Sequence, residues 1–418
     1  MNANSANFPS VSVTSDEGFT AASHSDTPPS TRPQRRMRRL MLAVPLALVG
    51  ALHYAVWALF THGQGSDTLF ATALAVYLVF SMLAIPAGLL SLRTRNPRWG
   101  AALSWTGLLA LGQFSSLFVL GLLRAIVLPA FEWAGAPVQG WADSSAWVAV
   151  ALAFALTALG FVVARMRPGV VEVEIPIADL PPELHGFRIA QITDIHVGPT
   201  IRRGYLQRIV DQVNALQADL VAITGDVVDG DVPTLQTHVA PLQQLQAREG
   251  VALVLGNHEL YSGAQAWVRE FRRLGLRVLM NEHFVVQRDQ ATLAVAGVTD
   301  HSTGRFHPEW ACDPHAAIQG TGATADVRLL LAHQSLSAPA GADAGYHLAL
   351  HGHTHGGQWW PWNHFVRMQQ PVVKGLHRFG RMWSYTSVGT GYWGPPKRHF
   401  RAEITLLVLR RSTTDPHK

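Results

Sequence analysis

The chain has 418 residues, of which 48% are hydrophobic and 15% are charged, and its formal net charge is +5. This length exceeds one ordinary domain, and the composition changes near residue 167, so two parts are expected. The single cysteine, Cys312, excludes an intrachain disulfide and a thiolate zinc site. Many arginines flank long apolar stretches rather than one polar face, which favours membrane topology over nucleic-acid binding.

The first part of the chain is predicted to be a tail followed by membrane helices. Residues 1–37 are rich in Ser, Thr, Asn and Pro and end in arginines, which predicts a disordered, basic-ended tail. Residues 38–167 form the predicted transmembrane region, because each of its uncharged stretches can cross about 30 Å of hydrocarbon as a helix. These stretches span about 40–60, 69–92, 100–123 and 146–164. Buried helices of a soluble fold are the alternative, which four such stretches disfavour.

The arginines also predict an orientation. They precede the first span, join the second to the third and follow the fourth, whereas Arg124 is the only strong base expected in the other two loops. By the positive-inside rule, both termini and the domain after the spans lie on the cytoplasmic side of the inner membrane. A cleaved or twin-arginine signal at the first span is the competing interpretation, which three further spans disfavour. His53, within the first span, is assigned no role.

Residues 168–418 alternate between strand and helix patterns typical of an α/β domain. Alternating apolar residues predict a strand over 171–177, and a helix follows from the spacing over 206–216. Short apolar runs predict further strands at 187–193, 220–224, 251–255, 327–331 and 346–350. Polar motifs come directly after five of these strands, where open α/β sheets place their sites.

These motifs supply carboxylates, imidazoles and one amide. They are Asp194-Ile-His196, Gly225-Asp226-Val-Val-Asp229, Gly256-Asn257-His258-Glu259, His333 and Gly352-His353-Thr-His355. Mixed oxygen and nitrogen donors favour two divalent ions such as Mn, Fe, Zn or Co, since Mg and Ca prefer mostly oxygen. Each motif alone is an ordinary turn or a structural histidine, but their order, each at a strand end, predicts one metal centre. The glycines beside the ligands are expected to let the backbone turn sharply.

The set resembles the calcineurin-like metallophosphoesterase superfamily, whose motifs run in the same order, over about residues 170–410. The resemblance implies a four-layer αββα sandwich built on βαβαβ units, preceded here by the four-helix transmembrane region. It further implies one metal held by Asp194, His196, Asp226 and His355, with Asp226 bridging to a second held by Asn257, His333 and His353. His258 would face the leaving group and Asp229 would orient its imidazole. Glu259 is expected to be structural.

The end of the chain narrows the resemblance to one group. Asp229 is followed by Gly230 rather than arginine, which disfavours a protein serine/threonine phosphatase. Gly352-His-Thr-His-Gly-Gly-Gln358 and Ser387-Val-Gly-Thr-Gly391 resemble the YkuE-like membrane-associated phosphodiesterases, which are similar to enzymes that cleave the pyrophosphate of UDP-2,3-diacylglucosamine. Arg398 and the inserted Trp359 and Trp360 are candidate substrate contacts, with packing or solvent exposure as the alternative.

The sequence therefore predicts a membrane-anchored hydrolase of a phosphodiester or pyrophosphate bond. A hydroxide bridging two divalent metals would attack the phosphorus, and the substrate is expected to be lipid-linked. The membrane is the expected partner besides this substrate, and no nucleic acid or protein partner is predicted. The alternative is a non-catalytic membrane sensor or scaffold that uses the domain for binding. A transporter or receptor role for the spans is disfavoured, because they lack intramembrane charge pairs.

Overall fold

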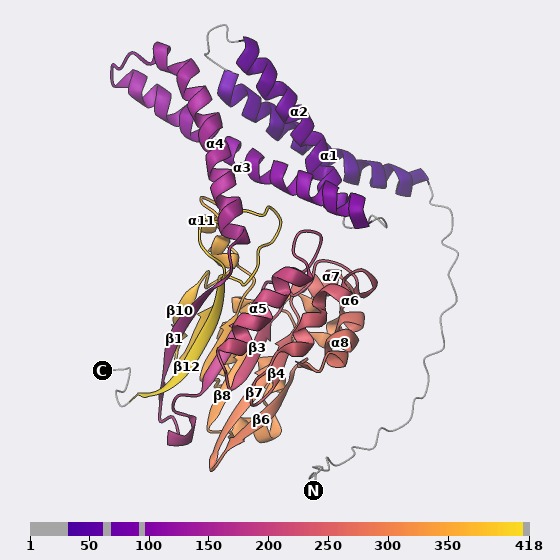
Figure 1. Ribbon diagram of the computed structural model, residues 1–418, viewed down its shortest axis with the longest axis vertical. Coiled ribbons are helices and arrows are strands. Elements are labelled where there is room, and N and C mark those ends of the chain that lie inside the picture. Colours follow the sequence, from indigo (N-terminus) through magenta and orange to yellow (C-terminus); the bar gives the residue numbers. More distant parts are fainter. Residues whose placement is uncertain (1–31, 62–67, 92–96, 413–418) are drawn as a thin grey trace. The chain divides into compact units, whose positions relative to one another are not determined.

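Four long apolar helices precede an α/β domain in the computed structural model, which describes residues 32–61, 68–91 and 97–412 (Figure 1). The contacts divide the chain into two compact units, Met1–Ala51 and Leu52–Lys418. The helices are α1 (Arg32–Thr61), α2 (Thr68–Leu90), α3 (Pro97–Trp133) and α4 (Ala142–Arg165). All four are long and apolar enough to cross a membrane, by length and composition.

Two predicted boundaries in this region differ from the structure. The predicted disordered tail lies outside the described residues up to position 31, but its end, from Arg32 to Met37, is the start of α1. Arginine is a good helix former, so the helix can continue beyond its apolar stretch. The third span was predicted to end at Leu123, whereas α3 continues to Trp133.

Arg124 consequently lies inside α3 and not in a loop. Its guanidinium is buried and donates hydrogen bonds to Leu59 O at 2.9 Å, Ala142 O at 2.8 Å and Ser145 Oγ at 3.0 Å. Carbonyls near helix ends lack an intrahelical partner, and Leu59 lies in the last turn of α1. The charge therefore stabilises a helix end and is compensated by backbone and hydroxyl dipoles.

The α/β domain contains two six-stranded mixed sheets. The first has the order β1 (Gly169–Ala178), β12 (Glu403–Ser412), β2 (Arg188–Ile192), β3 (Leu220–Thr224), β4 (Val251–Val254) and β5 (Arg277–Val278). The second has the order β10 (Gly375–Phe379), β11 (Met382–Thr386), β9 (Leu348–His351), β8 (Val327–Leu331), β7 (Ala291–Gly297) and β6 (Glu282–Arg288). The antiparallel hairpins β6–β7 and β10–β11 were not predicted.

The sheets and helices make the predicted four layers. One apolar cluster lies between the two sheets and joins Leu220 and Val254 to Leu293 and Leu329. A second packs the other face of the first sheet against α5 (Arg203–Ala215), α6 (Val232–Val239) and α8 (Ala264–Arg273). A third covers the second sheet with α9 (Pro314–Ala317) and α10 (Ala338–Asp343). Two short helices, α7 (Asn257–Tyr261) and α11 (Asn363–Val366), follow strand-end loops.

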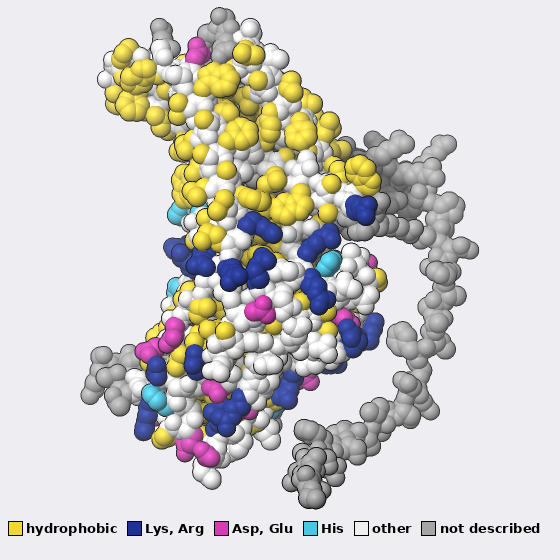
Figure 2. Space-filling view, in the orientation of Figure 1, with side chains coloured by type: hydrophobic (Ala, Val, Ile, Leu, Met, Phe, Trp, Pro, Cys, Tyr) yellow, Lys and Arg dark blue, Asp and Glu magenta, His cyan; other side chains and the backbone are white. Residues whose placement is uncertain are grey.

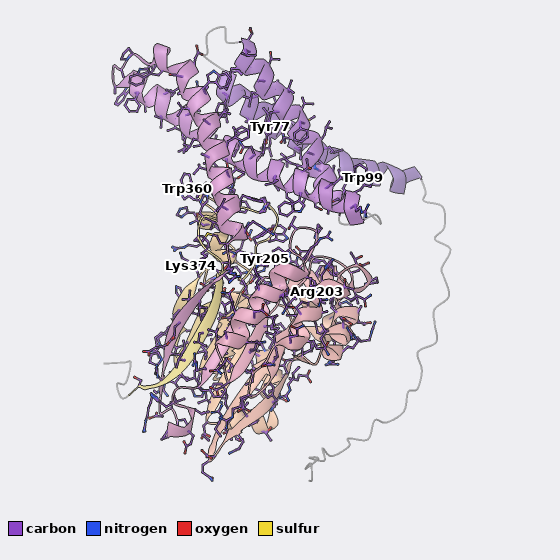
Figure 3. All side chains as sticks on the ribbon, viewed as in Figure 1. Tyr77, Trp99, Arg203, Tyr205, Trp360 and Lys374 are labelled. Atoms are coloured by element: carbon purple, nitrogen blue, oxygen red, sulfur yellow. The ribbon has the colours of Figure 1, made fainter. Side chains whose placement is uncertain are left out.

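The α/β domain contacts α3 and α4 through polar side chains. Lys397 is buried and donates from Nζ to Ser116 Oγ of α3 at 2.6 Å. Arg165, in the last turn of α4, donates to Thr200 O and to the hydroxyl of Tyr392, both at 3.1 Å. Its guanidinium also lies 5.6 Å from the ring centre of Tyr205, which Figure 3 labels at this junction. The domain is therefore held against the membrane helices by directional bonds.

Two glycines allow α2 and α3 to approach closely. A methyl group added to Gly107 would lie 2.7 Å from Gly88 Cα and 3.0 Å from Gly88 N. Small residues at such contacts are the usual means of close helix packing in membranes. We expect Gly107→Ala to destabilise the protein by about 1–3 kcal/mol through overpacking. Thermal unfolding of the purified full-length protein in detergent measures this change.

Gly140→Ala is the matched control, because an added methyl group there meets no atom of the described residues within 4 Å. Equal unfolding temperatures for the two variants would contradict the close α2–α3 contact.

Candidate metal centre

The predicted ligands converge at the carboxyl ends of five strands. Asp194 and His196 follow β2, Asp226 follows β3, Asn257 follows β4, His333 follows β8, and His353 and His355 follow β9. Six of the seven are buried, and His353 is partly exposed. The structure thus brings together all seven ligands predicted from the sequence.

The backbone at these ligands is strained. Asp194, Asp226 and His355 have φ angles of 54°, 52° and 50°, and His196 and His353 also have positive φ. Non-glycine residues rarely adopt this left-handed region, and such strain persists where the surroundings enforce it, often at functional sites. The neighbouring glycines act in two ways. Gly225 has a φ of 90° and supplies the predicted turn, whereas a methyl group on Gly256 would lie 2.6 Å from Asp226 N.

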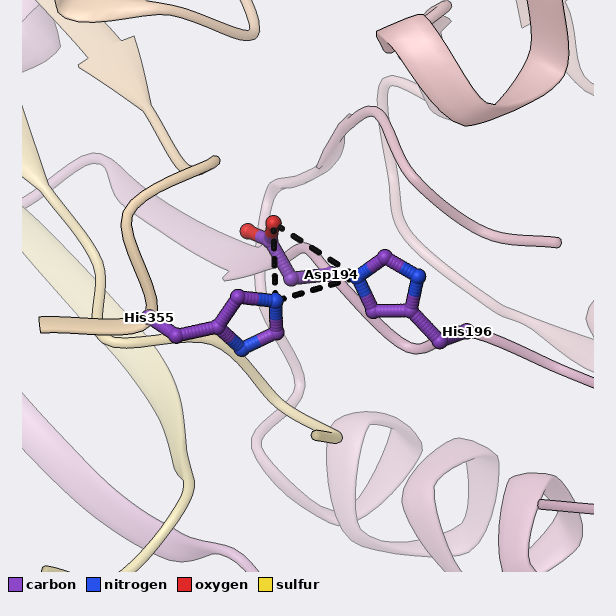
Figure 4. A group of neighbouring side chains, drawn as sticks. All are labelled: Asp194, His196 and His355. Atoms are coloured by element: carbon purple, nitrogen blue, oxygen red, sulfur yellow. Dashed lines mark hydrogen bonds and ion pairs between the residues drawn. The ribbon is translucent and has the colours of Figure 1, made fainter. Parts of the chain in front are cut away.

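One ligand group contains Asp194, His196 and His355 (Figure 4). His196 Nε2 and His355 Nε2 are 3.0 Å apart, and Asp194 Oδ1 lies 3.5 Å from His355 Nε2. His196 Nδ1 donates to Asp229 Oδ1 at 2.9 Å, so the Nε2 lone pair remains available. Two atoms about 2.1 Å from one cation and at right angles lie about 3.0 Å apart, which fits this spacing.

The second group contains Asp226, His333 and His353. His333 Nε2 lies 3.0 Å from Asp226 Oδ2 and 3.2 Å from His353 Nδ1. The Nδ1–H of His333 donates to Thr224 O at 2.7 Å, which again leaves the lone pair of Nε2 available to bind a metal. The buried Oδ1 of Asn257 has no hydrogen-bond partner among the described residues. An orphaned acceptor in the cleft that Asp226 and His353 also line fits a cation, so the residues present suit a metal.

Asp226 connects the two groups. Its Oδ2 lies 3.9 Å from His196 Nε2 and 3.0 Å from His333 Nε2. Burial alone would raise the pKa of Asp226, but the surrounding imidazoles, with His333 first, hold it well below its ordinary value. A carboxylate that stays ionised in this position can contact cations on both sides.

The side chain of Asp229 accepts two hydrogen bonds, of which the one from His258 was predicted. Its Oδ1 accepts from His258 Nδ1 at 2.6 Å and from His196 Nδ1 at 2.9 Å. It therefore orients the proposed acid and also a metal ligand. Burial would lower the pKa of His258, but the charges of Asp226 and Asp229 outweigh it and raise that pKa to about 9.

Glu259 organises the loops beneath the ligands, a role more specific than the structural one expected. Its buried carboxylate accepts four backbone N–H groups: from Gly256 at 2.7 Å, Asp226 at 3.0 Å, Val227 at 2.7 Å and Val228 at 3.0 Å. Burial and the Asp226 charge raise the pKa of Glu259 to about 7, and the N–H bonds oppose this rise. The loops after β3 and β4 are thus tied to one side chain.

The ligands open into a cleft of about 450 Å³ with aromatic walls. Trp359 lines it, and the buried indole N–H of that residue has no hydrogen-bond partner among the described residues. Tyr261, Trp362 and Trp393 also line it. The ring of Trp393 lies 5.6 Å from that of His258. Tyr261 and Trp393 were not predicted, although Tyr261 follows His258 by three residues on one helix, a spacing that places both on one face.

The other two predicted substrate contacts lie elsewhere. The segment of residues 359–368, called the inserted segment below, has Trp360 on the side away from the metal cleft, where the backbone N–H of Trp360 donates to His399 Nδ1 at 3.0 Å. Arg398 is fully buried, and its guanidinium donates to the carbonyls of Val388, Gly391 and Phe400. It does not line the cleft, so the prediction of a phosphate contact at Arg398 does not fit this structure. The guanidinium instead holds the loop after β11.

The comparisons with known proteins agree with this geometry. A family model described as calcineurin-like phosphoesterase matches residues 187–357. A transmembrane protein with metallophosphoesterase domain from Danio rerio is 34% identical over 330 residues, which cover 76% of this chain and 75% of that protein. The chain belongs to the calcineurin-like phosphoesterase family. With its four apolar helices, it is a membrane-associated metallophosphoesterase with residue clusters that can hold metal ions.

Two further relatives extend the comparison to cattle and bacteria. A protein of the same description from Bos taurus is 35% identical over 275 residues, which cover 63% of this chain and 62% of that protein. The metallophosphoesterase YkuE from Bacillus subtilis is 28% identical over 244 residues, which cover 55% of this chain and 82% of that protein. The YkuE-like resemblance and the predicted sandwich fold of the metallophosphoesterases are thereby confirmed.

The role of Glu259 can be tested separately from the ligands. In Glu259→Gln an amide NH₂ replaces one carboxylate oxygen, so two backbone N–H groups lose their acceptor. Each buried N–H without a partner costs about 1–3 kcal/mol, so we expect chemical unfolding to show a loss of about 2–6 kcal/mol for the two groups. The exposed Glu183→Gln is the control. Unchanged stability of Glu259→Gln would show that the carboxylate does not hold the two loops.

Proposed function

We propose that this metallophosphoesterase hydrolyses a phosphodiester or pyrophosphate bond in a lipid-linked substrate, with UDP-2,3-diacylglucosamine as the first compound to test. The observation that supports a lipid-linked substrate is a hydrogen bond between the cleft and a membrane helix. Trp362 lines the cleft and donates its indole N–H to Ser115 Oγ of α3 at 2.8 Å. A substrate anchored in the bilayer therefore has a short path to the ligands.

Two divalent ions, of Mn, Fe, Zn or Co, are the proposed cofactors. Asp194, His196, Asp226 and His355 would hold one, and Asn257, His333, His353 and again Asp226 would hold the other. When bound, such ions acidify water and neutralise charge on phosphate oxygens. The seven side chains supply four imidazole nitrogens, two carboxylates and one amide oxygen, and the four nitrogens favour these metals over Mg and Ca.

His258 is the proposed acid for the leaving group. Its Nδ1 is occupied by Asp229, so Nε2 is the ring atom that can donate a proton to a departing oxygen. The side chain lines the cleft beside Trp393 and is partly exposed, as contact with a substrate requires. Asp229 is a positioning residue that fixes this ring and that of His196.

The catalytic domain is proposed to lie on the cytoplasmic side of the inner membrane. This orientation rests on the positive-inside rule, because Arg165 ends α4, Arg167 follows it and Arg98 lies at the start of α3. Arg124 lies inside α3 and no longer counts as a loop residue. Because it had been counted on the opposite side of the membrane, its removal leaves the excess of arginines on the cytoplasmic side.

Metal dependence is the first test of the function. Full-length protein stripped with a chelator should lose hydrolysis of a panel containing a nucleotide-diphosphate lipid, a glycerophosphodiester, a cyclic nucleotide and a monoester. Added Mn²⁺ should restore it, with two metal ions per chain by elemental analysis. Asp226→Asn should lower activity by about 10³-fold or more, because one ligand charge shared by both sites is removed.

Exposed Asp211→Asn is the matched control and should retain parental activity. A parental rate in Asp226→Asn would refute the site assignment, a preference for the monoester would refute the phosphodiesterase proposal, and the absence of bound metal would favour a scaffold.

His258 can be separated from the ligands by varying the leaving group. His258→Gln should lower kcat about 10²–10⁴-fold for an alkyl phosphodiester. The loss of kcat should be much smaller for a p-nitrophenyl ester, because its leaving group, p-nitrophenolate, departs without a proton. Asp229→Asn should cause the same loss and also bind metal about 10–100-fold more weakly, because His196 loses its orienting partner. Equal losses with both leaving groups would contradict the acid role.

A further inference from the structure

A second cleft lies on the other side of the inserted segment that follows the last metal ligand. Its volume is about 410 Å³, and it shares no lining residue with the metal cleft. The short helix α11 stands between them, with Asn363 and His364 facing the second cleft and Trp362 and Val366 facing the first. The proposed reaction uses none of its residues.

The charged side chains that line the second cleft are all cationic. Two strong cations, Arg367 and Lys374, line it, and both are exposed. Among the described residues, no aspartate or glutamate lines it. Three histidines also line it, namely His364, His377 and His399. An arginine fork and a lysine at one concave surface are the groups that bind phosphate in proteins.

His399 adds an oriented donor. Its Nδ1 accepts the backbone N–H of Trp360 at 3.0 Å, so the proton of the neutral ring is on Nε2. Burial, together with Lys397, lowers the pKa of His399, which keeps the ring in this neutral form. The cleft therefore combines two full charges with a fixed N–H group.

The surroundings of this cleft resemble a membrane interface. Arg398, next to His399, donates its backbone N–H to Gly160 O of α4 at 3.0 Å. Large apolar side chains on the same segment are exposed, namely Trp360 at 48%, Phe365 at 56% and Met368 at 82%. Figure 3 labels Trp360 near the end of α4 and Lys374 just beyond it. In Figure 2, Lys and Arg side chains gather in a band beside the apolar helices.

We propose that this second cleft binds the headgroup phosphate of an anionic phospholipid. Arg367 and Lys374 contact the phosphate oxygens, and the exposed aromatic and methionine side chains contact the glycerol and upper acyl chains. A soluble phosphate offers the same oxygens but gains nothing from the apolar edge, which is why the lipid is the ligand we assign. The site is independent of the proposed hydrolysis.

The test uses native mass spectrometry of the purified full-length protein in detergent, with three probes. These are palmitoyl-oleoyl phosphatidylglycerol, phosphatidylcholine with the same chains, and inorganic phosphate. The parent should prefer phosphatidylglycerol, and R367Q/K374Q should bind it about tenfold more weakly or worse, because two charge-assisted contacts are lost. R367K/K374R keeps both charges and should retain most of the affinity, which separates charge from folding.

The matched control is R248Q/R269Q, which removes the same net charge from two exposed positions away from this cleft and should stay within about twofold of the parent. Asp226→Asn should also retain the lipid, since the metal cleft is separate. Equal weakening in the control pair, or no preference of the parent for phosphatidylglycerol over phosphatidylcholine, would overturn the proposal. Inorganic phosphate binding tighter than the lipid would identify a soluble ligand and overturn the lipid assignment.

Discussion

The candidate metal centre depends on the hydrogen bonds that the Glu259 carboxylate accepts. It gathers N–H groups from two loops that follow different strands, at Gly256 and over Asp226–Val228. These loops place Asp226 and Asn257 at adjacent strand ends, and the strained φ at Asp226 persists because its own N–H is held. A buried carboxylate whose acceptor sites are all occupied by N–H donors fixes two loops with one side chain.

The same loops carry Asp229, which extends the fixed geometry to the imidazoles. Since Asp229 Oδ1 accepts from both His196 and His258, the orientation of one metal ligand and of the proposed acid comes from a single oxygen. A change at Asp229 is thus expected to affect metal binding and proton donation together. Loss of activity in such a variant alone cannot identify Asp229 with either role, whereas the leaving-group comparison at His258 can.

The convergence of the candidate ligands could be predicted from the sequence because each is a short local motif after an apolar run, and parallel strands bring their carboxyl ends to one edge. The hydrogen bond from His196 to Asp229 was not predicted, because no local pattern marks it, whereas the bond from His258, 29 positions from Asp229, was implied by the family resemblance. Arg124 and Arg398 were misplaced for one shared reason. Their charges are compensated by backbone carbonyls, and no sequence pattern marks which carbonyls a fold leaves free.

The inserted segment after Gln358 determines properties that the metal motifs do not. One side of it, with Trp359 and Trp362, forms a wall of the metal cleft, and the other, with Arg367, lines the basic cleft. Under the proposed function, the metal ligands fix the bond type that can be hydrolysed, while the surrounding walls decide which substrate fits. This segment also bonds to α3, because the Trp362 indole N–H donates to Ser115 Oγ, so a wall of the cleft and a membrane helix are in direct contact. Under the proposed function, the walls that select the substrate are therefore joined to the membrane helices by this short stretch of chain.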